Sequence, residues 1–448
     1  MAAPSMALAA NVTDAMIEKV RTKVQELFET SDTVAAMIRK SGEVEKISDK
    51  LYRIPLVKYR GGITSVFDAD GGDMGSGTGM KVIKVTGGYK YTRSTWEISK
   101  RAMDTTDSAE KSTINILAYT LKNAIRECQK QDDIHFHTNG SGILTDYASA
   151  TSTWTSSKTT YTFGKTGDGV GVSRLAPGMA VVSADYDGSA ANTEAPDPLV
   201  IDHIDWTNKV VYLDGIVSGA VGSATGDILV VPGMTATFQS FQSTWPLSGD
   251  TFRHGLYYAM DNTTSNYYLG LLKSDETELL PNYVNAGGTD EISFASVQAL
   301  LDQITNRRDE SMYSGLVGLF HPAQRAAIFN KGYAQGTWLR KGGEKSPDLG
   351  MANNAYSDGF DVCGIPCRTD KRQSKNRVDF IIPKLWGRAM LHDLKFHEVG
   401  GKTIFESRAA TGNLKAAQHF HLVSAFDYVS FDPGSQGYIY GLVVPSGY

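Results

Sequence analysis

The sequence predicts an α+β protein in which strands and helices alternate around a mixed sheet. Three observations lead to this prediction. An apolar stripe with helical spacing runs through residues 108–133, short strands and turns crowd the segment 146–250, and strand and helix patterns follow one another after residue 251. At 448 residues, the chain is long enough for roughly two to four domains.

The amino-acid composition indicates which broad classes of protein this chain can belong to. Hydrophobic residues make up 41% of the chain and charged residues 21%, which is typical of a folded globular protein. The formal net charge of -5 gives no sign of tight binding to nucleic acid. Three cysteines do not make a disulfide framework and fit a reducing compartment. We expect neither a membrane-spanning helix nor a secretory signal, because no long apolar run occurs and no basic residue precedes Lys19.

The first 100 residues predict an arm and a projecting hairpin. Residues 12–29 carry apolar side chains at helical spacing, and a shorter helix is expected at 32–40. Residues 51–62 then read as a strand that Pro55 confines to a sheet edge, and residues 80–99 read as its return strand. Because a two-stranded hairpin is marginally stable alone, we expect this one to lie on another surface.

The middle of the chain predicts a long helix followed by a β-rich segment. Apolar residues recur at three and four residues from about Ser108 to about Asp133, which gives a helix of roughly 40 Å with one apolar stripe. We expect such a helix to pack against a sheet. The segment 146–250 has short strands separated by turn residues, and it predicts a small antiparallel barrel or sandwich.

The last third predicts a domain of mixed class. A helix is expected at 292–308, and a buried strand at 315–322 ends at Pro322, which begins the next helix. We expect the aromatic, Gly-rich tail at 436–448 to form an edge strand. Further strands are expected at 358–370, 377–384, 403–409 and 417–431.

The segment QDDIHFHTNGSGIL, Gln131 to Leu144, is the first candidate site. Two aspartates and two histidines could bind a divalent metal ion. However, His135 and His137 are expected just past the helix, without a partner at a set spacing. We favour a structural interpretation, in which Asp132 and Asp133 form the polar face of the last helical turn and a Gly-rich reversal follows. A phosphate-binding loop is excluded because this loop follows a helix instead of opening one.

Other candidate motifs are weaker. His419 and His421 share one face of a predicted strand, but no Glu or further His follows at a useful distance, so a satisfied or solvent-facing pair is favoured over a metal site. The acidic segment at 68–73 lacks the ligands of an EF-hand, and GGKT at 400–403 lacks the first Gly of a phosphate loop. We therefore expect no catalytic residue, no cofactor and no metal, and a protein that is not an enzyme.

The order of these parts resembles the major capsid protein of tailed double-stranded DNA phages, which has the Hong Kong 97-type fold. The segment 1–50 is similar to the family's N-terminal arm, and the hairpin resembles its extended loop, the E-loop. The long helix resembles the family's spine helix. The resemblance implies an arm at 1–50, the hairpin at 51–100, the spine helix at 101–145, an inserted β domain at 146–250, and the remaining peripheral and axial domains at 251–448.

Three short motifs add to this resemblance. HTNGSGIL, after the long helix, is similar to the family's usual exit from its spine helix. LFHPAQRAAIFN, at 319–330, resembles the strand-Pro-helix step of the axial domain, and DVCGIPCRTD, at 361–370, resembles its Gly-Ile-Pro strand.

The resemblance implies a structural protein that self-assembles into hexamers and pentamers of an icosahedral shell enclosing viral DNA in the virion. Its partners would be other copies of itself, with scaffolding, portal or decoration proteins possible and packaged DNA contacted weakly. The residues expected at contacts between subunits are Pro55, Tyr59, Phe67, Asp70, Asp73, Lys81, Lys84, Arg93, Val20 and Phe28.

Two refinements and two alternatives accompany this interpretation. We expect no removal of a scaffolding segment, because about 50 residues precede the hairpin and Met1 is present, and no chemical cross-link through Lys81 or Lys84. The nearest alternative with the same fold is a shell protein of an encapsulin-type nanocompartment. A different class would be a β-rich, metal-dependent enzyme that uses the two His-Phe-His pairs.

Overall fold

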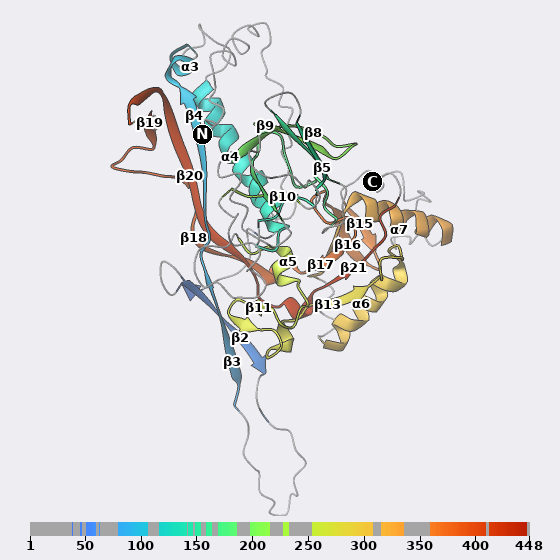
Figure 1. The fold of residues 1–448 in the computed structure, drawn as a ribbon. Helices are drawn as coiled ribbons and strands as arrows, with labels where there is room; N and C mark the ends of the chain where they lie inside the picture. The colour runs from blue at the N-terminus through green and yellow to red at the C-terminus, as the bar shows by residue number, and fades with distance from the viewer. Residues whose placement is uncertain are drawn as a thin grey trace, which may run out of the picture.

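The computed structural model describes a mixed α+β chain of several sheets and few helices, as the sequence predicts (Figure 1). The predicted helices of the N-terminal arm, with Val20 and Phe28, lie outside the described residues, apart from Ile38. The described residues are 38, 45–46, 51–59, 62, 79–105, 116–140, 142–146, 148–153, 158–163, 169–185, 198–215, 227–232, 253–307, 315–335, 359–408 and 412–445.

A long antiparallel sheet forms one side of the molecule. Its central strand β20 (Leu414–Ser430) pairs with β18 (Trp386–Phe396), β19 (Ile404–Arg408) and β4 (Tyr91–Ser99). The helix α4 (Ile116–Phe136) runs alongside this sheet (Figure 1). Its Ala124 and Cys128 are buried in one cluster with Ile98, Phe420 and Leu422 of the sheet. The predicted packing of a long helix on a sheet is therefore confirmed, although the helix continues to Phe136, beyond the predicted end.

The predicted hairpin is shorter than expected. Strands β2 (Leu51–Tyr59) and β3 (Lys81–Gly88) pair antiparallel, and β1 (Glu45–Lys46) pairs antiparallel with the first part of β2 on its other side. The prediction of one return strand over 80–99 is wrong, because the chain changes sheets at Tyr89 and Lys90 and then continues as β4 beside β20. Among the described residues, only β3 pairs with β2 at Pro55, which suits a residue without a backbone N–H.

A second, six-stranded mixed sheet has the order β13-β21-β17-β14-β16-β15. The tail strand β21 lies between β13 and β17, so the prediction of an edge strand is wrong. The segment 358–370 forms two strands instead of one, because Cys363 and Gly364 make a turn with φ angles of 50° and 80°. Helix α7 begins at Pro322, as predicted. The strands are β13 (Asn282–Asn285), β14 (Val317–Phe320), β15 (Gly359–Val362), β16 (Ile365–Thr369), β17 (Val378–Ile381) and β21 (Gly437–Tyr440); the helices are α6 (Phe294–Arg307) and α7 (Pro322–Gln335).

The β-rich segment forms one sheet of six antiparallel strands in the order β10-β7-β8-β9-β6-β5. The expected barrel or sandwich is not seen in the described residues, where β10 and β5 lie at the two ends of the sheet. Its core includes Ile134 at the end of α4, so the sheet packs against that helix. The strands are β5 (Ala148–Thr153), β6 (Thr159–Phe163), β7 (Ala180–Asp185), β8 (Leu199–Asp205), β9 (Val210–Asp214) and β10 (Asp227–Val230).

Short elements complete the fold around a central hydrophobic core. This core joins the root of the hairpin to the ends of α4 and β20, with Tyr52, Phe136, Trp386 and Phe426 among its buried residues. Of the described helices, none is both long and apolar enough to cross a membrane. The short elements are α3 (Lys100–Thr105), α5 (Leu256–Ala259), β11 (Tyr267–Tyr268), β12 (Leu271–Leu272), η1 (Thr277–Leu279), η3 (Pro383–Leu385) and η4 (Pro433–Ser435).

Candidate functional site: the hairpin arm and its buried polar joint

The hairpin β2–β3, here called the arm, is amphipathic at its root. Residues alternate between two faces along each strand, and one face carries Tyr52, Ile54 and Val85, which are all buried in the central core. Gly87 is required beneath Tyr52, because a Cβ at position 87 would lie 2.3 Å from the Tyr52 hydroxyl oxygen. The arm is therefore held by close packing at its root.

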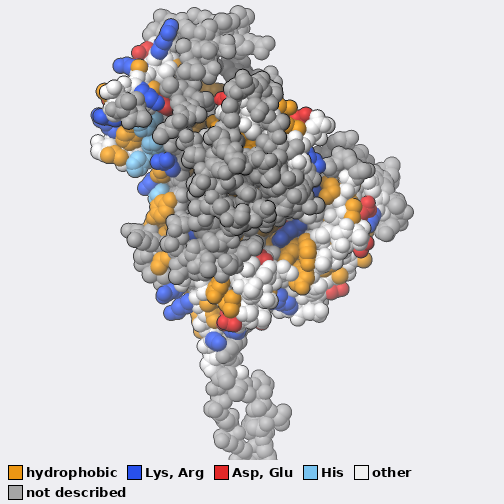
Figure 2. Space-filling view, viewed as in Figure 1, with side chains coloured by type: hydrophobic (Ala, Val, Ile, Leu, Met, Phe, Trp, Pro, Cys, Tyr) orange, Lys and Arg blue, Asp and Glu red, His pale blue; other side chains and the backbone are white. Residues whose placement is uncertain are grey.

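The opposite face of the arm is exposed and partly apolar. Pro55 pairs with Lys84 and Val57 pairs with Val82, so these four residues share one face. Val57 is 56% exposed and Val82 is 38% exposed, and Met80 at the start of β3 is 61% exposed. Figure 2 shows hydrophobic side chains next to Lys and Arg side chains around the root of the arm. We call these exposed apolar residues the strip, and a group of this kind on a projecting hairpin suits a surface that another molecule covers.

The predicted contact residues fall into three groups. Pro55, Lys81 and Lys84 are exposed on the arm. Arg93 is exposed but belongs to β4 of the long sheet, opposite Val423, and not to the hairpin as expected. Only the backbone of Tyr59 is described, and the remaining predicted contact residues lie outside the described residues: Phe67, Asp70, Asp73, Val20 and Phe28.

Asp427 of β20 connects the arm to the body of the protein. The Tyr52 hydroxyl donates to Asp427 Oδ2 at 2.9 Å, while His254 donates from its backbone N–H to Oδ1 at 2.8 Å and from Nδ1 to Oδ2 at 2.5 Å. All three side chains are buried. Burial raises the pKa of Tyr52 and the carboxylate adds to this, so the phenol stays protonated and remains a donor.

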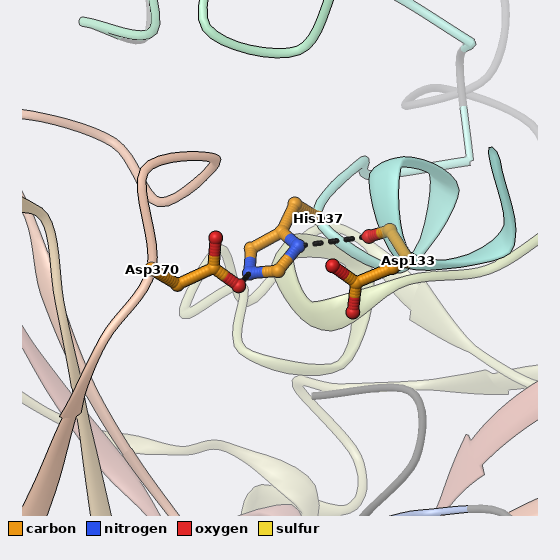
Figure 3. Close-up of side chains that lie close together, drawn as sticks. All are labelled: Asp133, His137 and Asp370. Carbon is orange, nitrogen blue, oxygen red and sulfur yellow. Dashed lines mark hydrogen bonds and ion pairs between the residues drawn. The ribbon is translucent and has the colours of Figure 1, made fainter. Parts of the chain in front are cut away.

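The end of α4 is tied to the loop after β16 by buried charges (Figure 3). Arg372 contacts the carboxylate of Asp133, and both side chains are almost fully buried. His137 donates from Nδ1 to the backbone oxygen of Asp133 at 3.0 Å, and its Nε2 lies 3.3 Å from Asp370 Oδ2. Burial lowers the pKa of His137, and Asp370 only partly offsets this. Asp133 was expected on the polar face of the last helical turn, and the structure shows that this position is buried under the loop and Arg372. His135, expected past the helix, also lies within its last turn.

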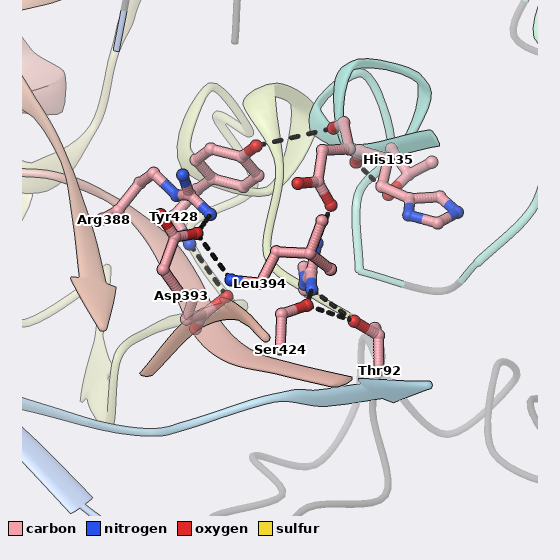
Figure 4. A network of polar contacts seen from close by, with 11 residues as sticks. Thr92, His135, Arg388, Asp393, Leu394, Ser424 and Tyr428 are labelled. Atoms are coloured by element: carbon pink, nitrogen blue, oxygen red, sulfur yellow. Dashed lines mark hydrogen bonds and ion pairs between the residues drawn. The ribbon is translucent and has the colours of Figure 1, made fainter. Parts of the chain in front are cut away.

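A second buried connection is made by Arg253, whose partners include Thr92 and Ser424, both labelled in Figure 4. Its guanidinium is 0% exposed, pairs with Asp132 of α4 and donates to Ser424 Oγ of β20 at 2.5 Å and to Thr92 of β4. Its carbon Cζ lies 3.5 Å from the ring centroid of Phe426, which adds a cation–π contact. Asp132, Asp133, Arg253, Arg372 and Asp427 are called the polar joint below.

A group of residues with metal-ligand character lies at the edge of the polar joint. Asp133, His137 and Asp370 each place one ligand atom within 4.8 Å of the others. However, Arg372 already contacts Asp133, and Arg174 is close enough to lower the pKa of His137. A divalent cation would face two guanidinium groups there, so the arrangement fits an internal ion pair better than a metal centre.

The side chains of the polar joint are arranged to stabilise the fold. The carboxylates of the joint are paired or hydrogen-bonded, and burial lowers the pKa values of the neighbouring His137 and His254. Proton transfer instead needs an accessible group with a pKa near neutral. The nearby Cys128 thiol has its pKa raised to about 11 by burial, which makes it a poor nucleophile. Sequence reasoning did not identify Arg253 or Asp427. A charged residue inside the apolar strand run SAFDYVSF is the signal that could have identified Asp427.

Comparison of this chain with known proteins gives matches among solved structures. No protein-family model matches the sequence, and no curated protein sequence matches it significantly. A chain of the cyanophage A-1(L) capsid asymmetric unit is similar over 95% of this chain and 96% of its own length, with a TM-score of 0.51 and 12% sequence identity. A chain of the native GTA particle capsid is similar over 94% and 93% of the two chains, with a TM-score of 0.47 and 9% identity.

A chain of the holo encapsulin complex from Synechococcus elongatus is similar over 96% of this chain and 96% of its own length, with a TM-score of 0.45 and 7% identity. Of these three structures, the cyanophage capsid chain is the one whose likeness is strong enough to assign a fold. The protein therefore has the fold of a phage capsid protein, the Hong Kong 97-type fold that the order of its motifs predicts.

Proposed function

We propose that the protein is a structural capsid protein, copies of which assemble as hexamers and pentamers into an icosahedral shell around double-stranded DNA. The observation that carries this proposal is the similarity of fold to the cyanophage capsid chain, which extends over nearly the full length of both chains. In a closed shell, each copy contacts its neighbours through matching surfaces, and the exposed face of the arm described above would supply one of them.

In this proposal the arm corresponds to the E-loop and α4 to the spine helix. The exposed strip with Val57 and Val82 would be covered by a neighbouring copy, and Pro55, Lys81 and Lys84 would lie at the same contact. Arg93 would contact a neighbour from the long sheet. The β5–β10 sheet would be an inserted domain. Residues 1–50 would form a separate N-terminal segment that reaches a neighbouring copy.

The polar joint supports this role mechanically. It connects the arm, α4, the long sheet and the loop after β16 through buried, paired charges. A buried network of this kind fixes the angles between the segments, because each charge loses its partner if a segment moves. A shell built from many copies requires such a defined geometry in each subunit.

The net charge of -5 suits a shell that encloses DNA without binding it tightly. We propose no catalytic activity and no cofactor. Scaffolding, portal or decoration proteins of the same virus are compatible partners, and the virion is the proposed location.

Electron microscopy of the protein expressed alone, together with analytical ultracentrifugation, tests the proposal. Closed shells or rings of hexamer size are expected, and co-expression with candidate scaffolding proteins is the follow-up if only small species form. Closed shells that carry an enzyme cargo and no DNA after expression in the native host would favour the nanocompartment alternative. A discrete monomer that stays monomeric with every candidate scaffold would contradict the proposed function.

A further inference from the structure

Three histidines meet on the outer face of the long sheet, away from α4. His419 and His421 are two residues apart on β20, and their ring centroids are 4.9 Å apart. His397 follows β18, and its backbone N–H donates to the backbone oxygen of His421 at 2.9 Å, which places it beside that residue. The ring centroids of His397 and His421 are 6.2 Å apart. Figure 2 shows histidine side chains gathered at the surface in this part of the molecule.

Hydroxyl groups on both flanking strands orient two of the rings. Thr95 lies opposite His421 on β4, and its Oγ1 is 2.8 Å from His421 Nδ1. Ser407 of β19 has its Oγ 3.1 Å from His419 Nδ1. Each Nδ1 is thus engaged by a fixed neighbour, which leaves the two Nε2 atoms for another ligand. Histidines that bind metal ions generally have their second ring nitrogen held in this way.

The spacing of His419 and His421 fits a single metal ion, and His397 has to rotate toward them to complete the site. Two imidazoles that bind one Zn²⁺ at ~2.0–2.1 Å with a tetrahedral angle have ring centroids about 5 Å apart. The separation of 4.9 Å between His419 and His421 meets this requirement. His397 is exposed, so rotation about its side-chain bonds can bring its ring about 1 Å closer.

The surroundings of the three histidines include one aromatic ring and charges of both signs. Phe405 packs near all three rings, with centroid distances of 5.7 to 6.2 Å, and shields one side from water. Partial burial and the nearby Arg93 lower the pKa of His421, and the positive charge of Arg93 opposes a bound cation. Glu97 lies opposite His419 on the same face and is partly compensated by Lys415 at 3.9 Å.

We propose that His397, His419 and His421 bind one divalent transition-metal ion of the zinc type, with water as the fourth ligand. Imidazole nitrogen selects Zn²⁺, Co²⁺, Ni²⁺ and Cu²⁺ over Mg²⁺ and Ca²⁺, which prefer oxygen ligands. The ion joins the end of β18 to β20 within one subunit. The proposal departs from the absence of a metal expected from the sequence, and it does not rest on the proposed function, because the site lies within a single chain.

The test uses the full-length protein without a polyhistidine tag, after treatment with a chelator. Isothermal titration with Zn²⁺ at pH 7.5 should give one binding site, and Co²⁺ should give the visible absorption bands of a tetrahedral site. His419→Ala combined with His421→Ala should abolish both signals, and His397→Ala should weaken binding. His392→Ala is the matched control, because His392 lies on β18 of the same sheet beside Tyr91 and outside the cluster.

A second pair of variants tests the role of the hydroxyls. Thr95→Val and Ser407→Ala keep the three histidines, and each should weaken Zn²⁺ binding by about 10- to 100-fold. Circular dichroism and thermal unfolding of each apo variant establish that it is folded. The proposal is overturned if the wild-type protein binds no Zn²⁺, if binding survives loss of His419 and His421, or if Mg²⁺ competes equally. Loss of binding in Asp133→Asn instead would move the site to the polar joint.

Discussion

The Tyr52 hydroxyl in the arm donates to Asp427 in β20, a residue 375 positions later in the chain. This single buried hydrogen bond joins the root of the arm to the strand at the centre of the long sheet. Asp427 also accepts from the backbone and the ring of His254, so the carboxylate has the donors that a buried charge needs. The direction of the arm therefore depends on a residue far from it in sequence.

Replacing Tyr52 tests this link. Tyr52→Phe keeps the ring in the core and removes one donor to a buried carboxylate, so we expect a loss of unfolding free energy of ~1–3 kcal/mol. Urea denaturation followed by circular dichroism measures it. Tyr91→Phe is the control, because Tyr91 is 62% exposed and its loss should change stability little. An unchanged midpoint for Tyr52→Phe would show that Asp427 does not require this donor.

The pair Asp133 and Arg372 gives a second prediction. Arg372→Met leaves the carboxylate of Asp133 buried without its cation, which should cost about 3–5 kcal/mol of unfolding free energy. Adding Asp133→Ala removes the uncompensated charge, so the double variant should be more stable than Arg372→Met alone.

The exposed pair of Lys331 and Glu291, 3.6 Å apart, is the matched control for this cycle. Lys331→Met should change the unfolding free energy by less than about 1 kcal/mol, because surface ion pairs contribute little. If the double variant of Asp133 and Arg372 were less stable than both single variants, the two residues would not act as a pair.

Sequence patterns predicted the elements whose signal is local. The stripe of α4, the start of α7 at Pro322 and the strand β2 all follow from spacing and turn chemistry near in sequence. The wrong predictions concern strands whose pairing partners are distant in the sequence. The strand β4 leaves the hairpin because β20 offers it a full ladder, and the tail strand β21 is internal because β13 pairs with it from more than 140 residues earlier.

The same reasoning explains which site residues were found. The exposure of arm residues such as Pro55 and Lys84 was predictable, because a hairpin without a core of its own must expose one face, and their role at subunit contacts stays a prediction. Arg253 and Asp427 were not identifiable, since they are significant only when α4, β4 and β20 come together. The cluster of His397 with His419 and His421 was missed for the same reason, because β18 and β20 pair across the chain.

His321 makes folding sensitive to mild acid. It precedes α7, and its Nδ1 accepts a hydrogen bond from the backbone N–H of Ala323 at 3.1 Å, which requires an unprotonated ring. Burial lowers the pKa of His321 from 6.5 to about 3. The unfolded state binds the proton more readily than the folded state. The stabilisation is thus complete above pH 6.5 and is lost as pH falls toward about 3.

This shift predicts a loss of about 2 kcal/mol of unfolding free energy at pH 5 from His321 alone. His321→Asn keeps a side-chain acceptor before the helix but does not titrate, so the variant should lose less stability between pH 7.5 and pH 5. Denaturant midpoints at these two pH values, compared with the wild type, measure the difference. Equal losses in the two proteins would show that protonation of His321 does not contribute.

The exposed strip of the arm predicts where assembly can be blocked without unfolding the subunit. Val57→Asp places a charge on the face that a neighbouring copy would cover, at a position that is 56% exposed in the single chain. The unfolding free energy should change by no more than about 0.5 kcal/mol, because exposed substitutions rarely do more. Assembly should fail, because buried unpaired charges at an interface cost several kcal/mol.

Leu414→Asp is the matched control, since Leu414 is 61% exposed but lies on β20 and not on the arm. Sedimentation and electron microscopy should show shells or rings for the wild type and for Leu414→Asp, and only small species for the arm variant. Shells of normal size from the arm variant would show that this strip is not an assembly contact. Because the root of the arm is buried through Tyr52 and Ile54, the variant retains the arm's attachment. A failure of assembly would therefore be assigned to the outer face alone.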